Sequence, residues 1–246
     1  MGRALWELRE ALLDFVYPRN IFCILCGEGI EKTERYSLCP LCKEQITFVH
    51  ERTCQQCGKP LEELYLPSEC PDCILSNHSF TQGYTCVIYD EEIKRLIYRF
   101  KYGKQRYLAY HLAEIMIDKL KEKEVEEIHW VLPVPLHKKR RQAREFNQSE
   151  ILAKYISREM GWPMDSKNLI RMKDTQTQNQ LSKEERKANM KNVFQIVQED
   201  KIKAKKILLI DDIYTTGSTL DSCSKVLLRA GAKEVYTLTF AAGRSI

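Results

Sequence analysis

The sequence lacks a long apolar run. Hydrophobic residues make up 43% of its 246 positions, yet apolar stretches such as VLPVPL at 131–136 fall far short of a membrane span, which takes about 20 residues. It also lacks a recognisable secretory signal, because the amphipathic start MGRALWELREALLDFVYP carries acidic residues. We therefore expect a cytoplasmic globular protein without a membrane span.

Cysteine is scarce after residue 80 but abundant before it. Only two of the ten cysteines, Cys86 and Cys223, lie in the later part, where they read as small core residues. The other eight lie between residues 23 and 73. In a reducing cytoplasm, clustered cysteines are more often metal ligands than disulfides.

The eight cysteines form one spacing pattern that occurs twice. Each repeat is a CxxC pair, twelve residues, and a second CxxC pair: Cys23, Cys26, Cys39 and Cys42, then Cys54, Cys57, Cys70 and Cys73. Two such turns supply the four thiolates of a structural zinc, so we expect two zinc ions. Pairing within each repeat is simplest, but an interleaved arrangement and a disulfide-stapled domain are alternatives.

The charge balance excludes a strongly basic protein. The formal net charge is +5 with cysteines counted as neutral. A zinc ion with four thiolates carries −2, so two such sites would lower the total to about +1. Any nucleic-acid contact therefore needs a local basic surface.

Apolar segments alternate with helical periodicity from about residue 80 onward. Strands are predicted at 84–90, 128–136, 205–211 and 234–242, and helices at 91–123 (broken near Gly103), 147–160 and 219–232. This alternation predicts an α/β fold with a parallel sheet. We divide the chain into an N-terminal helix (1–20) that docks on the protein or binds a partner or membrane surface, a cysteine-rich region (21–78) and the α/β domain (79–246).

The stretch ILLIDDIYTTGSTL (207–220) ends a predicted strand with an acidic pair, Asp211 and Asp212, followed by a loop rich in hydroxyls (the hydroxyl loop, residues 215–219). Ligands of parallel sheets bind beyond the carboxyl ends of the strands. Backbone N–H groups and hydroxyls of the loop suit a phosphate, and the carboxylates suit sugar hydroxyls or Mg²⁺. The implied ligand is a phosphorylated sugar, and the glycine–lysine pair of a Walker loop is missing.

This stretch resembles the phosphoribosyl-pyrophosphate loop of type I phosphoribosyltransferases. Nearly the whole chain resembles the ComF family, whose members include the ComFC-like competence proteins and join a double zinc ribbon to a phosphoribosyltransferase-like domain. Landmarks are KYG (101–103), PVPLH (133–137), FNQSEILA (146–153) and QLSKEERKANMKNVF (180–194). The resemblance implies a role in natural transformation, in uptake and handling of single-stranded DNA, with a helicase-like ATPase as partner.

The resemblance also assigns roles to residues. The acidic pair would contact the ribose hydroxyls or Mg²⁺ of phosphoribosyl pyrophosphate, and the hydroxyl loop would hold its 5-phosphate. The full ligand set is Asp211, Asp212, Tyr214, Thr215, Thr216, Gly217, Ser218 and Thr219. The pyrophosphate loop would contain His137, Lys138, Lys139, Arg140, Arg141 and Arg144, and the polar segment 171–190 would be a mobile hood.

The chain departs from the family pattern at Glu145, which stands where we expect glycine in the run Arg-Gly-Phe-Asn-Gln. A carboxylate beside a diphosphate is unfavourable unless it faces away or pairs with Arg144.

Cations and aromatics alternate over 94–107, which suits either single-stranded nucleic acid or an amphipathic helix with core aromatics. Three functions compete. The favoured one is a DNA-uptake factor that binds phosphoribosyl pyrophosphate; the others are an active phosphoribosyltransferase and a zinc-stabilised interaction module for the ATPase with a vestigial ligand site.

Overall fold

The computed structural model describes residue 12 and residues 20–50, 52–172 and 193–244. The chain falls into two compact units, residues 1–47 and 48–246. The predicted N-terminal helix lies almost entirely outside the described residues, as does most of the predicted hood. Among the described helices, none combines the length and the apolar character that a bilayer crossing demands.

The first unit is a small cysteine-bearing fold. Its described part contains the 3-10 turn η1 (Arg35–Ser37) and helix α2 (Pro40–Gln45). Cys39 caps α2 by accepting a hydrogen bond from the backbone N–H of Cys42, and Pro40 occupies the first helical position, where no N–H is needed. Local sequence thus fixes the geometry of one CxxC turn.

The second unit is built on a four-stranded parallel sheet in the order β1-β6-β5-β2. The strands are β1 (Gln82–Ile88), β2 (Trp130–Pro133), β5 (Lys206–Tyr214) and β6 (Glu234–Ala242). They are almost wholly buried, as parallel strands covered on both faces must be. The predicted α/β class and parallel sheet are confirmed, and each strand and helix predicted after residue 80 has its counterpart.

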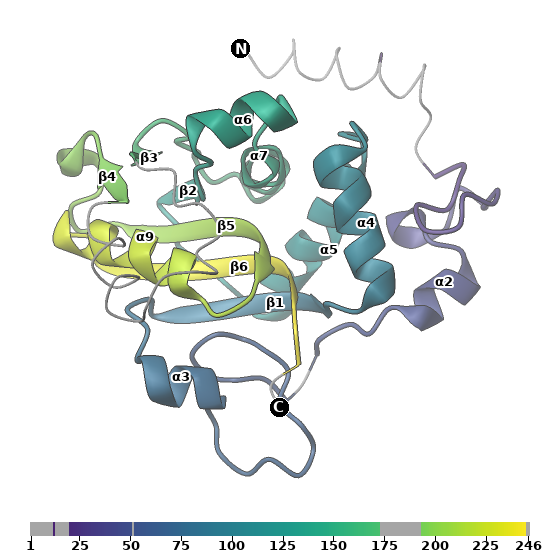
Figure 1. The fold of residues 1–246 in the computed structure, drawn as a ribbon, viewed down its shortest axis with the longest axis horizontal. Helices are drawn as coiled ribbons and strands as arrows, with labels where there is room; N and C mark the ends of the chain where they lie inside the picture. The colour runs from purple at the N-terminus through teal and green to yellow at the C-terminus, as the bar shows by residue number, and fades with distance from the viewer. Residues whose placement is uncertain (1–11, 13–19, 51, 173–192, 245–246) are drawn as a thin grey trace. The chain divides into compact units, whose positions relative to one another are not determined.

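Helices cover the sheet in two groups. Figure 1 shows α4 (Glu91–Tyr102), α5 (Leu108–Glu122) and α7 (Gln148–Met160) on one side, where α5 and α7 pack together. Helix α9 (Ser218–Arg229) packs on the other side, because its Leu220, Cys223 and Leu227 share a core with Ile207 and Leu209 of β5. Alternate residues of a strand face opposite sides, so Leu208 and Ile210 face the α5–α7 layer.

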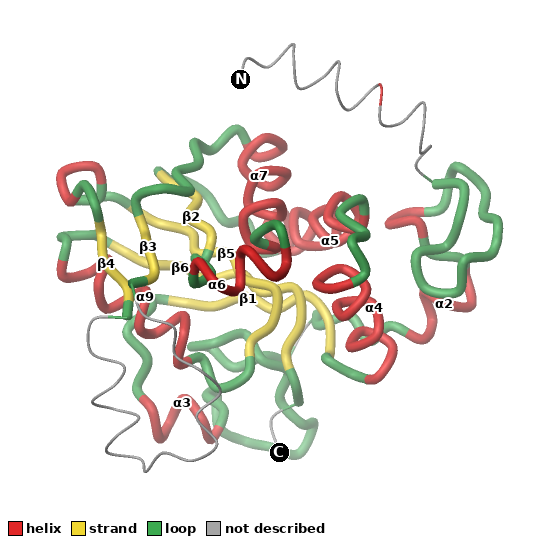
Figure 2. Tube along the Cα trace, turned by 45° about the horizontal axis from the view of Figure 1, so that its top comes forward, coloured by secondary structure: helices red, strands yellow, loops and turns green. Residues whose placement is uncertain are grey.

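Several short elements were not predicted, among them three of the larger unit that lie after β2. Helix α6 (Lys138–Arg144) follows β2, and a small antiparallel pair joins β3 (Leu169–Arg171) to β4 (Phe194–Ile196). Figure 2 shows β3 and β4 side by side, beside the larger sheet. The pair brackets most of the segment expected to be the hood.

The second cysteine repeat belongs to the core of the larger unit. Its four cysteines share a buried cluster with Phe80, Tyr214 and residues of β5 and α9. Helix α3 (Pro71–Ser76) carries the last of them. Gly58, in the left-handed conformation, lets the ribbon turn lie directly on β1, since a Cβ there would come within 2.4 Å of the Gly83 carbonyl oxygen.

The two glycines that follow a CxxC pair provide a matched test of this packing. We expect Gly58→Ala to destabilise the larger unit by about 2–4 kcal/mol, through backbone strain and the clash with β1. Gly27→Ala introduces the same strain in the smaller unit, at a position where a Cβ meets nothing within 4 Å. It should therefore leave the stability of the larger unit unchanged. Urea unfolding followed by helical circular dichroism measures both; equal effects would contradict the packing.

Candidate functional site

The second four-cysteine group (Cys54, Cys57, Cys70 and Cys73) has the geometry of a zinc site. Its sulfurs all lie within 4.8 Å of one another, with Cys57 and Cys70 sulfurs 3.7 Å apart. Zinc binds thiolate sulfur at about 2.3 Å, which places the sulfurs of a tetrahedral site about 3.8 Å apart. The group therefore fits a structural zinc.

The first four-cysteine group (Cys23, Cys26, Cys39 and Cys42) has similar spacing and different burial. Its sulfurs also lie within 4.8 Å of one another, with those of Cys26 and Cys39 3.8 Å apart. Cys26 is exposed and Cys39 is partly exposed, whereas all four cysteines of the second group are buried. Each group thus draws on one repeat, and the first is the more accessible to solvent.

The acidic pair lies in the last part of β5, at the carboxyl end of the sheet. Asp211 accepts hydrogen bonds from the Ser149 hydroxyl at 2.9 Å and from the backbone N–H of Asp212 at 2.9 Å. Burial raises the pKa of Asp211 to about 7, and the charge of Asp212 adds to this rise. A cation or a hydroxyl donor at this position would favour the ionised carboxylate.

Asp212 is held by a lysine from a distant part of the chain. The Lys101 ammonium lies 2.8 Å from its carboxylate, and both side chains are largely buried. Lys101 belongs to α4 and Ser149 to α7, so three elements meet at the acidic pair. The sequence marked KYG and FNQSEILA only as landmarks; it gave no sign that Lys101 and Ser149 contact these aspartates.

The hydroxyl loop leads from β5 into α9. Thr215, Thr216 and Ser218 are exposed, and the hydroxyls of Thr216 and Ser218 lie 2.8 Å apart. Gly217 has φ +72° and immediately precedes the helix, so the loop turns through a conformation that favours glycine. Exposed hydroxyls at the N-terminus of a twelve-residue helix can receive an anion.

Tyr214 differs from its neighbours in the predicted ligand set. It is only 1% exposed, and its hydroxyl lies 3.0 Å from Nε2 of His78. Its place is beneath the hydroxyl loop, on the side of the second four-cysteine group. His78 escaped sequence reasoning because it follows α3, 136 residues away in the chain.

The predicted pyrophosphate loop folds as α6. Arg144 donates to the Tyr102 hydroxyl at 2.6 Å and to the Gln148 side chain at 3.3 Å, and Arg141 lies 3.2 Å from the Glu150 carboxylate. His137 precedes the helix and Arg140 lies in it, while the side chains of Lys138 and Lys139 lie outside what the structure describes. Helix α6 begins shortly after the carboxyl end of β2.

Glu145 occupies a backbone position that favours glycine. Its φ is +66°, which explains physically why glycine suits this position. Its carboxylate pairs with Lys104 at 3.2 Å and Arg106 at 3.3 Å, and not with Arg144. The negative charge is thus compensated by the turn between α4 and α5.

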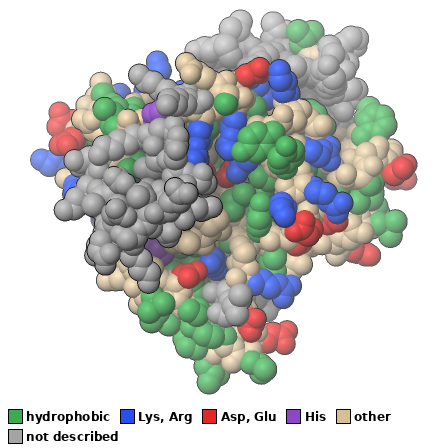
Figure 3. Space-filling view, viewed as in Figure 1, with side chains coloured by type: hydrophobic (Ala, Val, Ile, Leu, Met, Phe, Trp, Pro, Cys, Tyr) green, Lys and Arg blue, Asp and Glu red, His purple; other side chains and the backbone are tan. Residues whose placement is uncertain are grey.

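Exposed tyrosines and cations surround this turn. Helix α4 buries Ile93, Leu96, Ile97 and Phe100 and leaves Tyr98 and Tyr102 exposed. The rings of these tyrosines lie 5.0 Å apart, and the Arg144 guanidinium lies 4.8 Å from the centre of the Tyr102 ring. Figure 3 shows lysine and arginine side chains interspersed with hydrophobic ones on the face that carries α4.

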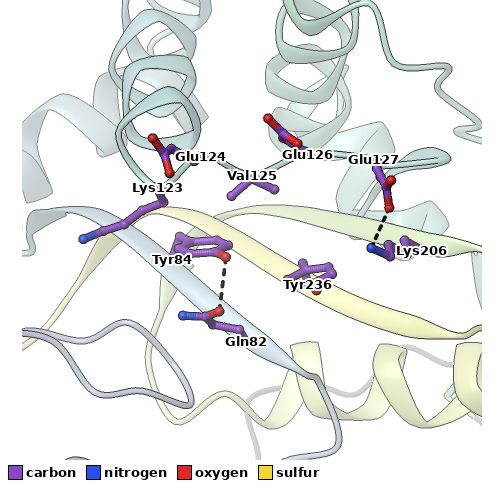
Figure 4. Close-up of a pocket in the computed structure, with 9 residues that line it drawn as sticks. All are labelled: Gln82, Tyr84, Lys123, Glu124, Val125, Glu126, Glu127, Lys206 and Tyr236. Atoms are coloured by element: carbon purple, nitrogen blue, oxygen red, sulfur yellow. Dashed lines mark hydrogen bonds and ion pairs between the residues drawn. The ribbon is translucent and has the colours of Figure 1, made fainter.

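A hollow of about 290 Å³ lies at the other end of the sheet, lined by residues at the amino ends of β1, β5 and β6. Figure 4 shows Tyr84 and Gln82 joined by a hydrogen bond there, and Lys206 paired with Glu127. Ligands of parallel sheets bind at the carboxyl ends. The acidic pair and the hydroxyl loop are therefore the stronger candidate site.

Comparison with known proteins agrees with this architecture. A double zinc ribbon domain model matches residues 12–74, and a phosphoribosyl transferase domain model matches residues 147–245. The chain is 31% identical to Competence protein F of Haemophilus influenzae over 88% of its own length and 94% of the relative's. It is 29% identical to DNA utilization protein YhgH of Escherichia coli K12, covering 87% and 93%. A glutamine phosphoribosylpyrophosphate amidotransferase from B. subtilis aligns with 53% of this chain and 25% of its own, at 20% identity and a TM-score of 0.38.

The unequal burial of the cysteine groups predicts zinc loss in two phases. A chelator should remove about one zinc per chain quickly, from the first group, and a second slowly, because buried thiolates must be exposed before they exchange. Zinc released to a chromogenic chelator gives both rates, and Cys26→Ser should abolish only the fast phase. A single phase from the wild-type chain would contradict the difference.

Proposed function

We propose, since the chain belongs to the ComF family of competence proteins, that it binds phosphoribosyl pyrophosphate with Mg²⁺ and takes part in handling single-stranded DNA during natural transformation. The observation that carries the ligand is the acidic pair, held at the carboxyl end of β5 directly before the hydroxyl loop. Carboxylates recognise ribose hydroxyls or Mg²⁺, and the loop recognises a 5-phosphate.

The donor set at the acidic pair fits Mg²⁺. Hard carboxylate oxygens are its usual protein ligands, and a few of them combine with substrate phosphates around the ion. Asp211 and Asp212 would hold it or the ribose hydroxyls, and the ion would neutralise part of the diphosphate charge. Ser149 and Lys101 keep the two carboxylates oriented by their contacts at 2.9 and 2.8 Å.

The diphosphate would meet the positive charge that converges from two elements. Lys101 of α4 reaches the acidic pair, and α6 places Arg140, Arg141 and Arg144 after β2. The negative charge of Glu145 repels the diphosphate less than a lone carboxylate would, since Lys104 and Arg106 already pair with it. Arginine side chains bind diphosphate oxygens through charge-assisted hydrogen bonds.

Single-stranded DNA would bind at the surface formed by Tyr98, Tyr102, Lys104 and Arg106 (the α4 surface). Here, exposed rings offer stacking platforms, and the two cations exceed the single charge of Glu145 with which they pair, so they offer phosphate contacts. Aromatic stacking carries little sequence preference, which suits incoming DNA of any sequence. The names of the relatives, a competence protein and a DNA utilization protein, support this role.

Replacing both acidic residues tests the ligand site. Asp211→Asn with Asp212→Asn should weaken magnesium-dependent binding of phosphoribosyl pyrophosphate at least about tenfold, since each lost charged contact contributes about 1.5–3 kcal/mol. The melting profile should show a folded protein. Calorimetry measures the affinity, and Asp200→Asn, an exposed acid in the 3-10 turn η2 (Glu199–Lys201), is the control. Equal affinities in the three proteins would refute the site.

The α4 surface makes a separate prediction. Tyr98→Ala with Tyr102→Ala should reduce the affinity for a fluorescent oligothymidylate at least about tenfold, because each base that stacks on an aromatic ring contributes about 1–3 kcal/mol. Tyr98→Phe with Tyr102→Phe keeps both rings and should retain most of the affinity. Fluorescence anisotropy at fixed salt concentration measures both variants. If the alanine variant binds like the wild type, DNA does not bind at this surface.

A further inference from the structure

The second four-cysteine group and the hydroxyl loop share a buried contact. Between them lie two rings, those of Tyr214 from the end of β5 and His78 from the segment after α3. They meet edge to face with centroids 6.3 Å apart, and the Tyr214 hydroxyl lies 3.0 Å from the imidazole. No site assignment made so far explains why a ribbon residue reaches this far.

Tyr214 connects directly to the ribbon side. Its ring belongs to the same buried cluster as the four cysteines. The Lys59 ammonium lies 5.4 Å from the centre of the ring and is itself fixed by Asp72 of α3 at 2.7 Å. The tyrosine ring and the four cysteines therefore share one packed core.

Gly217 connects the same rings to the loop. A Cβ on Gly217 would lie 2.3 Å from the Tyr214 hydroxyl and 2.9 Å from Cε1 of His78, so the loop backbone rests on both side chains. A second contact lies nearby, where the backbone N–H of Ser79 donates to Asp221 in the first turn of α9 at 2.8 Å. Loop and helix start are thus both held by the segment that leaves the ribbon.

We propose that zinc in the second four-cysteine group holds the hydroxyl loop in its binding conformation through Tyr214 and His78, so that zinc and a sugar phosphate in the loop stabilise each other's binding. The ligand half of this statement rests on the function proposed above. Tyr214 and His78 are positioning residues: they touch the loop from beneath and leave its exposed hydroxyls to the ligand.

The physical basis is that, among the described residues, the rings of Tyr214 and His78 lie directly against the loop backbone at Gly217. Without the metal, four thiols no longer need to converge, and the ribbon loses much of its folding free energy. Tyr214 then loses the surface on which it packs, and Gly217 loses the two rings beneath it. Linkage makes the effect reciprocal: a ligand that favours the ordered loop must slow zinc loss.

The experiment uses the full-length zinc-loaded chain and the variant Tyr214→Phe, which keeps the ring and removes the hydroxyl that contacts His78. Tyr84→Phe is the matched control, since it removes a tyrosine hydroxyl that bonds Gln82 at the other end of the sheet. Hydrogen exchange measured by mass spectrometry follows a peptide covering 214–220, and zinc release to a zinc-selective chromogenic chelator is followed in parallel, with and without magnesium phosphoribosyl pyrophosphate.

In the Tyr214→Phe variant, we expect the loop amides to exchange on the order of tenfold faster, because the buried imidazole of His78 is left unpaired. Zinc in the second four-cysteine group should be released correspondingly faster. Tyr84→Phe should match the wild type. In the wild type, the ligand should lower the rate of the slow phase of zinc release about tenfold, within the range usual for coupled sites. In Tyr214→Phe, the ligand should lower this rate by a smaller factor.

Two results separate the hypotheses. If Tyr214→Phe changes neither loop exchange nor slow zinc release, the coupling is overturned, whether or not the ligand binds. If it changes both while calorimetry detects no binding of phosphoribosyl pyrophosphate to the wild type, the loop–zinc coupling stands and the proposed ligand falls.

Discussion

The covering of a parallel sheet on both faces is the constraint on which the rest of this structure depends. Parallel strands are buried on both faces of their sheet, and α5 and α7 cover one face. Helix α9 alone does not make up the other core, which also contains Phe80, Tyr214 and four cysteines. Those thiols converge on one point within the apolar cluster, an arrangement that a bound metal stabilises. The second ribbon is therefore part of the core that positions β5.

The candidate site follows from where that core ends. Beyond the last apolar residues of β5, the chain places two carboxylates side by side, which is electrostatically unfavourable without compensation. Lys101 compensates Asp212 through an ion pair. For Asp211, burial outweighs its hydrogen bonds and the more distant Lys101 charge, and its pKa is raised to about 7. A carboxylate in this state is stabilised when a cation or a hydroxyl donor binds beside it. A magnesium-bound sugar would supply both.

Local patterns in the sequence predicted the strands of the parallel sheet and the helices that cover it, whereas long-range contacts could not be predicted. The strand ending in Asp211 and Asp212 was recognisable because apolar periodicity and a glycine-containing loop are local signals. Lys101 and His78 were not, because their contacts span 111 and 136 residues, respectively, and depend on how the helices pack. Glu145 shows the same limit. The sequence suggested Arg144 as its partner. In the structure its partners are Lys104 and Arg106, which lie in the turn between α4 and α5.

The two cysteine repeats show that one motif can have two physical roles. Both present four sulfurs within 4.8 Å and both have glycine in the left-handed conformation after the first pair. A Cβ added at Gly27 would meet nothing within 4 Å, whereas Gly58 lies on β1. Cys26 is exposed, while its counterpart Cys57 is buried. The sequences that follow explain the difference: the second repeat leads through His78 and Phe80 into the first strand of the sheet. Zinc in the first group would stabilise a small unit of its own, and zinc in the second would act on the core beneath the hydroxyl loop. Duplication of the motif therefore does not imply duplication of its function.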